Sequence, residues 1–112
     1  MKNFLNISDL SSKNLRDILN IDYQNIDFLK NKSIGMIFEK YSTRTRLSFN
    51  VGISQLGGCT VDIKFEDLNI SREESFEDTF RAMNCYLDGL VYRTSDHNKL
   101  IKASKYFHKP II

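Results

Sequence analysis

The sequence SIGMIFEKYSTRTR, residues 33–46, joins a short apolar run to a cluster of hydroxyl and guanidinium side chains. Its apolar part, residues 33–38, is typical of a strand in a parallel sheet that is covered on both faces. Residues 60–65 alternate polar and apolar side chains, which predicts a strand with one wetter face, at the edge of a sheet. Two further apolar runs, 90–92 and 110–112, predict two more short strands.

The segments between these runs carry helical patterns. Residues 12–19 open with serines that can cap a helix, and their apolar side chains fall on one face. Ser75 and Asp96 can each cap a further helix, because apolar residues recur at helical intervals after both. The sequence therefore predicts helices that alternate with strands.

In residues 46–54 the local pattern and the topology favour different structures. The apolar side chains of this segment alternate, and this pattern alone predicts a strand. Two parallel strands at 33–38 and 60–65 require a crossover between them, and the intervening residues are enough for one helix. On a helix the apolar residues of this segment fall on two sides, and Gly57-Gly58 is a stop signal. We therefore expect a helix here, buried on two faces.

Strands that alternate with helices over 112 residues predict a single α/β domain. We expect a three-layer fold in which a parallel sheet of about four strands is flanked by helices. The net charge of +2 is spread along the chain, which argues against a nucleic-acid partner. The sequence shows no secretory leader and no apolar run long enough to span a membrane, so we expect a cytoplasmic protein without a membrane partner.

Cysteine and histidine chemistry is not indicated by the sequence. Cys59 and Cys85 lack the spacing of metal ligands or of a redox motif, and we expect them to be reduced, buried thiols. His97 and His108 stand without partner ligands, so we expect surface or helix-end histidines rather than a catalytic base. We expect neither a metal nor a cofactor.

The segment 42–46 concentrates three hydroxyls and two guanidiniums at the junction between a predicted strand and a predicted helix. The start of such a helix presents unpaired N–H groups and the positive end of its dipole, which bind anions. Arg44 adds a planar guanidinium that can hold two phosphate oxygens at once. The alternative interpretation is an ordinary serine or threonine cap followed by surface arginines. The density of donors favours a phosphate site.

Residues 38–49 and the following 55–58 closely resemble the carbamoyl-phosphate motif of the aspartate/ornithine carbamoyltransferase family. Further matching segments follow the family's order along essentially the whole chain: 9–11, 72–79, 86–89, 93–94 and 109–112. The resemblance implies that residues 1–112 are a truncated carbamoyl-phosphate-binding domain. The second domain of the family, which binds the amino-acid substrate, is absent from this sequence.

The resemblance also assigns roles to individual residues. Ser42, Thr43, Arg44 and Thr45 would bind the phosphate of carbamoyl phosphate, while Thr45 and Arg93 would reach its carbonyl oxygen. Arg44, Thr45 and Arg93 are therefore the expected catalytic residues. An amine that attacks this carbonyl builds negative charge on its oxygen, and preformed donors aimed there lower the barrier.

A loop of the family crosses to the neighbouring subunit of a homotrimer, and by resemblance Asn69, Arg72 and Glu74 belong to it. The Glu39-Lys40 and Arg93-Thr94 pairs resemble ornithine rather than aspartate enzymes, and the loop lacks the lysine that aspartate enzymes place there. The resemblance thus implies an ornithine carbamoyltransferase, which makes citrulline and phosphate in arginine biosynthesis.

Some features depart from the family pattern. Tyr41 replaces the usual proline, and Asn50 stands where glutamate is common. Arg46, by contrast, matches the family motif and is expected to serve structure. The sequence stops at Ile112, before the segment that completes the carbonyl site and before the ornithine-binding elements, so we expect this chain alone to be inactive.

Three alternatives to this interpretation stay open. The first is a carbamoyltransferase of the same family that uses aspartate or another amine as acceptor. The second is a non-catalytic module for phosphate binding or oligomerisation. The third is a receiver-type signalling domain, which would need an acidic cluster at the strand ends, and Glu39 with Asp67 makes only a weak one.

Overall fold

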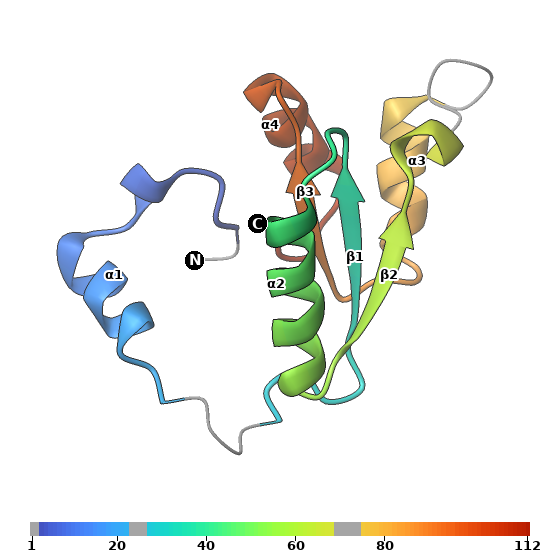
Figure 1. The fold of residues 1–112 in the computed structure, drawn as a ribbon. Coiled ribbons are helices and arrows are strands. Elements are labelled where there is room, and N and C mark those ends of the chain that lie inside the picture. The colour runs from blue at the N-terminus through green and yellow to red at the C-terminus, as the bar shows by residue number, and fades with distance from the viewer. Residues whose placement is uncertain (1–2, 23–26, 69–74) are drawn as a thin grey trace.

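A computed structural model describes residues 3–22, 27–68 and 75–112. Its central feature is a parallel sheet with strand order β2-β1-β3 (Figure 1). The elements in chain order are η1 (Ile7–Asp9), α1 (Ser12–Leu19), β1 (Ser33–Phe38), α2 (Thr43–Gln55), β2 (Cys59–Ile63), η2 (Phe65–Leu68), α3 (Phe76–Met83), β3 (Gly89–Arg93) and α4 (His97–Tyr106). The predicted α/β fold with a helix-flanked parallel sheet is confirmed.

The sheet has three strands where about four were expected. The fourth expected strand, 110–112, contributes only an isolated parallel bridge between Leu90 and Ile111 at the outer edge of β3. Pro110 has no N–H to donate to a ladder, and the backbone N–H of Phe4 donates to the Ile111 carbonyl at 2.8 Å from the other side. The N-terminal segment therefore lies along this edge, and β2 forms the opposite edge, as predicted.

Helices cover the two faces of the sheet unequally. On one face α3 and α4 pack over Ile37, Leu90 and Tyr92, with Phe80 and Phe107 almost fully buried between them. On the other face α2 packs over the sheet in a smaller cluster of buried side chains: Met36, Ile53 and Val91. Figure 1 shows α1 set apart from the sheet, beyond α2.

The segment with alternating apolar residues is the helix α2, as topology predicted and local pattern did not. Its helical face with Phe49 and Ile53 packs on the sheet, whereas Leu47 and Val51 are 56% and 51% exposed. The expectation of burial on two faces is therefore wrong within the described residues. The exposed pair explains the misleading alternation, because these residues lie on the face of α2 that the sheet does not cover.

The end of α2 follows from its glycines. Gly57 has a φ of +86°, a left-handed conformation in which a side chain would be strained. The N–H of Gly58 donates to the carbonyl of Ile53 at 3.0 Å, which closes the last turn of the helix. The predicted stop at Gly57-Gly58 is confirmed, and it directs the chain into β2.

Two expectations about individual side chains are settled by the fold. Cys59 and Cys85 are free, as expected, but both are exposed, so the expectation of buried thiols is wrong. Cys59 begins the edge strand, and Cys85 follows the C-terminal end of α3.

Among the residues described, no helix has the length and apolar character needed to cross a membrane.

Candidate functional site

The ends of β1 and β3 bring the predicted site residues to one edge of the sheet. Phe38 and Arg93, the last residues of these strands, are partners in the parallel register. The N–H of Glu39 donates to the Arg93 carbonyl at 3.0 Å, so the backbones stay together beyond the last pair. Because α2 begins at Thr43, its N-terminus lies at the same edge. Residues some 50 positions apart thus become neighbours, as the sequence predicted.

Arg93 contacts the Ser-Thr-Arg-Thr-Arg segment directly. Its Nη1 donates to Ser42 Oγ at 3.1 Å and to Thr45 Oγ1 at 2.9 Å. One guanidinium nitrogen therefore bridges the residue that precedes α2 and a residue in its first turn. This bridge places a cation beside two hydroxyls, which is a suitable arrangement for holding an anion.

The N-terminus of α2 differs from those of the other α-helices. Ser11, Ser75 and Asp96 each accept a hydrogen bond from a backbone N–H in the first turn of α1, α3 and α4. Ser42 occupies the same position before α2 but makes no such bond. Its hydroxyl instead accepts from Arg93. An ordinary capping serine, the alternative considered from the sequence, is therefore wrong for Ser42.

The N–H groups of the first turn of α2 are consequently left open. Within residues 27–68, the first α2 donor that finds an acceptor is the N–H of Arg46, which bonds to the Ser42 carbonyl at 3.1 Å. The preceding N–H groups, of Thr43, Arg44 and Thr45, point along the helix axis with the positive end of its dipole. An anion at this point would satisfy donors that the chain leaves unpaired.

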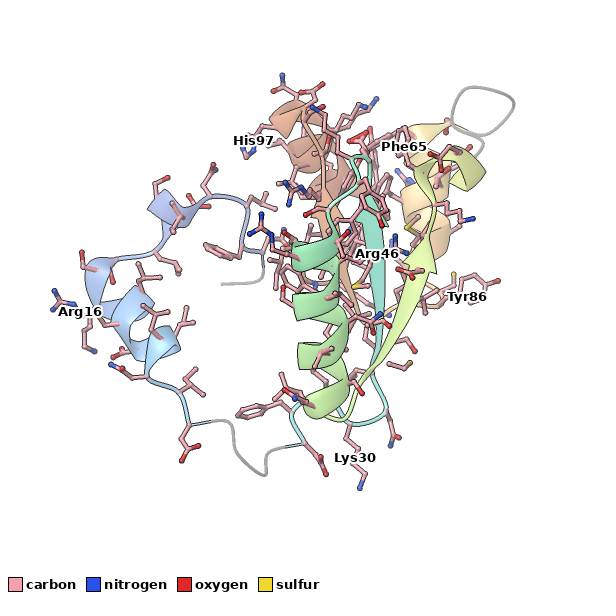
Figure 2. The ribbon with its side chains drawn as sticks, viewed as in Figure 1. Arg16, Lys30, Arg46, Phe65, Tyr86 and His97 are labelled. Atoms are coloured by element: carbon pink, nitrogen blue, oxygen red, sulfur yellow. The ribbon has the colours of Figure 1, made fainter. Side chains whose placement is uncertain are left out.

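The two arginines of the segment have different environments. Arg44 is exposed, and no hydrogen bond or ion pair engages its guanidinium in the part of the chain that is described. Arg46 forms an ion pair of 2.6 Å with Asp62 of β2 and ties α2 to the edge strand (Figure 2). Arg44 therefore remains available to a ligand, whereas Arg46 has the structural contact expected of it.

Two hollows adjoin the Arg93 bridge. One, of about 370 Å³, is lined by Thr45 and Arg93 among others. The other, of about 400 Å³, is lined by Ser42 and Glu39 among others. Phe38 lines both, so the hollows lie on either side of the end of β1. A ligand held at the start of α2 would have room on each side of the bridge.

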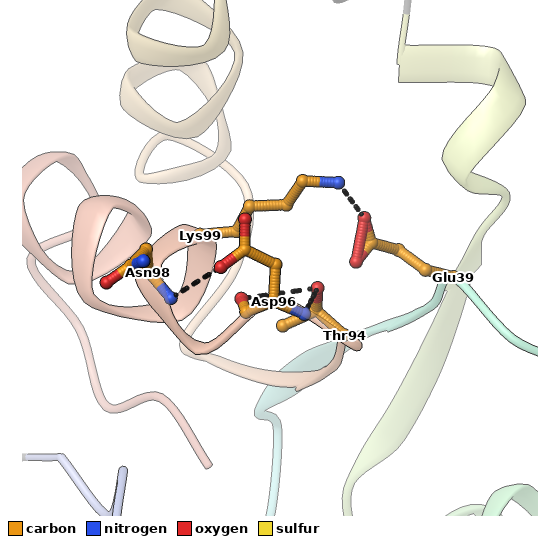
Figure 3. Close-up of polar contacts among 5 residues, drawn as sticks. All are labelled: Glu39, Thr94, Asp96, Asn98 and Lys99. Carbon is orange, nitrogen blue, oxygen red and sulfur yellow. Dashed lines mark hydrogen bonds and ion pairs between the residues drawn. The ribbon is translucent and has the colours of Figure 1, made fainter.

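A polar network supports the turn between β3 and α4 (Figure 3). Glu39 Oε1 accepts from Lys99 Nζ of α4 at 2.7 Å, and the Glu39 side chain is only 8% exposed. Asp96 caps α4 by accepting from the N–H of Asn98, and Thr94 Oγ1 accepts from the Asp96 N–H. Sequence reasoning missed the Glu39–Lys99 pair; a glutamate placed directly after a buried strand was the available signal.

Tyr92 lies beneath this network on the buried face of β3. Its ring stacks on Phe80 with centroids 5.7 Å apart. Burial, reinforced by the negative charge of Glu39, raises the pKa of Tyr92 well above its ordinary value. The phenol is therefore neutral at any physiological pH. It contributes packing below the site rather than a titrating group.

Several predicted residues lie elsewhere. Asn69, Arg72 and Glu74, expected in an inter-subunit loop, fall outside the described residues. His97 is the exposed first residue of α4 and lines the hollow beside Arg93, whereas the N–H of exposed His108 donates to Asn84 Oδ1 at 2.7 Å. Residues 3–22, 27–68 and 75–112 contain no group of three or more metal-ligating side chains that could hold an ion.

Comparison with known proteins decides the family. The family model for "Aspartate/ornithine carbamoyltransferase, carbamoyl-P binding domain" matches residues 2–112. The chain belongs to this family. The resemblance seen in the sequence is thus confirmed, and it covers nearly the whole chain.

Individual members of the carbamoyltransferase family are similar in both sequence and structure. An ornithine carbamoyltransferase of Methanosarcina acetivorans is 38% identical over 99% of this chain and 40% of its own length. The anabolic ornithine carbamoyltransferase of Campylobacter jejuni matches with a TM-score of 0.89 and 34% identity, over 100% of this chain and 38% of that one. The catalytic subunit of M. jannaschii aspartate transcarbamoylase matches with a TM-score of 0.79 and 28% identity, over 100% of this chain and 41% of that one. The chain thus spans about two fifths of the length of the relatives that it matches.

Proposed function

We propose that residues 1–112 are a carbamoyl-phosphate-binding domain whose site is the start of α2 together with Arg93. The observation that carries this proposal is the bridge from Arg93 to Ser42 and Thr45, at 3.1 and 2.9 Å, beside an uncapped helix N-terminus. The phosphate would accept from the open N–H groups of α2, the hydroxyls of the segment and the free Arg44 guanidinium. The family to which the chain belongs supports this choice of ligand.

The same donors suit the chemistry of carbamoyl transfer. An amine nitrogen attacks the carbonyl carbon, the carbon–oxygen bond to phosphate breaks, phosphate leaves, and the amine loses a proton. Negative charge grows on the carbonyl oxygen and on the leaving phosphate, so fixed cations and hydroxyls stabilise the transition state. Arg93 and Thr45 are proposed to face the carbonyl oxygen, and Ser42, Thr43 and Arg44 to hold the phosphate.

For a protein with the full length of its relatives, we propose transfer to the side-chain amine of ornithine, giving citrulline and phosphate. Relatives named ornithine carbamoyltransferase, at up to 38% identity over 99% of the chain, support ornithine over aspartate as the acceptor. The acceptor would bind to a second domain. A homotrimer, a cytoplasmic location and a role in arginine biosynthesis complete the proposal.

Calorimetric titration with carbamoyl phosphate tests the site. Arg44→Ala should weaken binding by at least about tenfold, because it removes a charge-assisted hydrogen bond to the phosphate. Arg16→Ala is a matched control, since Arg16 lies in the last turn of α1, set apart from the sheet (Figure 2). Equal affinity of wild type and Arg44→Ala would overturn the proposed site. In a full-length protein, formation of citrulline from ornithine without formation of carbamoyl-aspartate from aspartate would support ornithine as the acceptor, and the reverse result would overturn it.

A further inference from the structure

The Glu39–Lys99 ion pair has no role in the site as described so far, yet it lies directly beside it. We propose that this pair sets the anion affinity of the site: Lys99 neutralises a carboxylate that would otherwise repel the bound phosphate. The inference rests on the proposed function, because it needs an anion at the start of α2. It assigns a tuning role to two residues that do not themselves contact the ligand.

The position of Glu39 makes its charge matter to the site. Glu39 is the first residue after β1, three positions before Ser42, and both residues line the same hollow. Its side chain is only 8% exposed, so water screens its charge poorly. The Oε2 atom is buried and has no hydrogen-bond partner among the described residues. Lys99 is therefore the residue that compensates this carboxylate.

Lys99 is held in place from two sides. Its Nζ lies 2.7 Å from Glu39 Oε1 and 5.0 Å from the centre of the Phe65 ring, a cation–π arrangement. The lysine thus links α4 to the end of β1 and to η2 (Figure 3 shows the first of these links). With a side-chain exposure of 40%, Lys99 also reaches solvent and is more tolerant of losing its partner than Glu39 is.

The charges around the site then sort into balanced and unbalanced groups. Arg46 is balanced by Asp62 at 2.6 Å, and Glu39 is balanced by Lys99. Arg44 and Arg93 have no anionic partner in the described residues and so supply the positive field for the ligand. Lys64 and Glu66, which line the same hollow as Glu39 and Ser42, are opposite in sign.

Substitutions of the two residues of this ion pair should change the phosphate affinity in opposite directions. Glu39→Gln keeps the shape of the side chain, removes a negative charge and leaves Lys99 unbalanced, so phosphate should bind about fivefold more tightly. Lys99→Met leaves the buried carboxylate uncompensated, so phosphate should bind about fivefold more weakly. A purely structural pair predicts instead that both substitutions weaken binding, because both break the same contact.

The experiment is a calorimetric titration of wild type and variants with inorganic phosphate at low and high ionic strength. The double variant Glu39→Gln/Lys99→Met should return to near wild-type affinity, since its net charge is unchanged. Lys102→Met is the matched control, because it removes a lysine of the same helix that sits over Phe76 and has no ion pair with Glu39. The differences should shrink with added salt. Thermal unfolding of each variant separates a loss of affinity from a loss of fold.

The possible results lead to different conclusions. Tighter phosphate binding by Glu39→Gln supports the inference even if Lys99→Met fails to fold, because Glu39→Gln removes the negative charge without changing the shape of the side chain. Unchanged or weaker phosphate binding by a folded Glu39→Gln overturns the inference. The proposed function still stands in that case if wild type binds phosphate and Arg44→Ala weakens this binding. A folded wild type that binds neither phosphate nor carbamoyl phosphate overturns both proposals.

Discussion

Replacing Arg93 tests whether this residue contacts the carbonyl oxygen of carbamoyl phosphate rather than its phosphate group. The guanidinium is fixed by two hydroxyls, Ser42 Oγ at 3.1 Å and Thr45 Oγ1 at 2.9 Å, so its position does not depend on a ligand. Arg93→Ala removes this cation and the two hydrogen bonds that hold it. We expect carbamoyl phosphate to bind more weakly, and inorganic phosphate to be affected less, because the carbonyl oxygen is the proposed contact of Arg93.

The size of the effect follows from the geometry. A hydrogen bond that involves a charged group contributes about 1.5–3 kcal/mol. Because Arg93 is exposed at the end of β3, solvent screening favours the lower part of this range. About 1.5–2 kcal/mol corresponds to about 10- to 30-fold weaker binding of carbamoyl phosphate. Arg93→Lys keeps the charge but not the planar geometry, so its affinity for carbamoyl phosphate should lie between those of wild type and Arg93→Ala.

Isothermal titration calorimetry with both ligands gives the relevant ratio. Arg93→Ala should lower the preference for carbamoyl phosphate over inorganic phosphate, whereas Arg44→Ala should weaken both ligands alike. If Arg93→Ala binds carbamoyl phosphate within about twofold of wild type, a difference of only about 0.4 kcal/mol, Arg93 does not contact this ligand as proposed. If Arg93→Ala weakens binding of the two ligands by the same factor, the carbonyl oxygen is not the contact of Arg93.

Two further predictions concern the stability of the fold. Asn84 Nδ2 donates to the Tyr106 carbonyl at 2.8 Å, and Asn84 Oδ1 accepts from the His108 N–H at 2.7 Å. Asn84→Ala should therefore lower the free energy of unfolding by about 2 kcal/mol, measured by urea denaturation, and an unchanged denaturation midpoint would contradict this. The N–H of Ser33 is the main cause that lowers the pKa of Asp88 below the ordinary value of 3.8, opposed by partial desolvation and aided by Lys32. Because the pKa of Asp88 is lower in the folded than in the unfolded protein, the charged carboxylate stabilises the fold above pH 3.8, and this stabilisation is lost as the pH falls through the folded pKa. Wild type should therefore lose stability relative to Asp88→Asn on acidification below 3.8. Parallel profiles of stability against pH for the two proteins would count against the role of Asp88.

Much of the fold was predictable because local patterns and topology agreed. Ser75 and Asp96 cap α3 and α4 as predicted, and the apolar run 33–38 forms the central strand. The helix α2 required topology, because Leu47 and Val51 are apolar yet exposed, which gave the segment a strand-like alternation. Local sequence does not record which face of a helix the rest of the structure leaves uncovered.

The site was predictable where it depends on strand register and unpredictable where it depends on long-range pairing. Ser42 and Arg93 meet because Arg93 ends β3 and Ser42 follows the end of its parallel neighbour β1, a relation that the order of elements implies. Glu39 and Lys99 are 60 positions apart, and no local pattern specifies that a lysine on α4 will reach the end of β1.

The open N-terminus of α2 is proposed to bind the phosphate group. The most direct measurement is a phosphate titration followed by amide nuclear magnetic resonance. The N–H signals of Thr43, Arg44 and Thr45 should shift together and saturate with one binding constant, because these donors have no acceptor within the described chain. Saturable phosphate binding that leaves these three signals unmoved would show that the phosphate binds elsewhere on the protein.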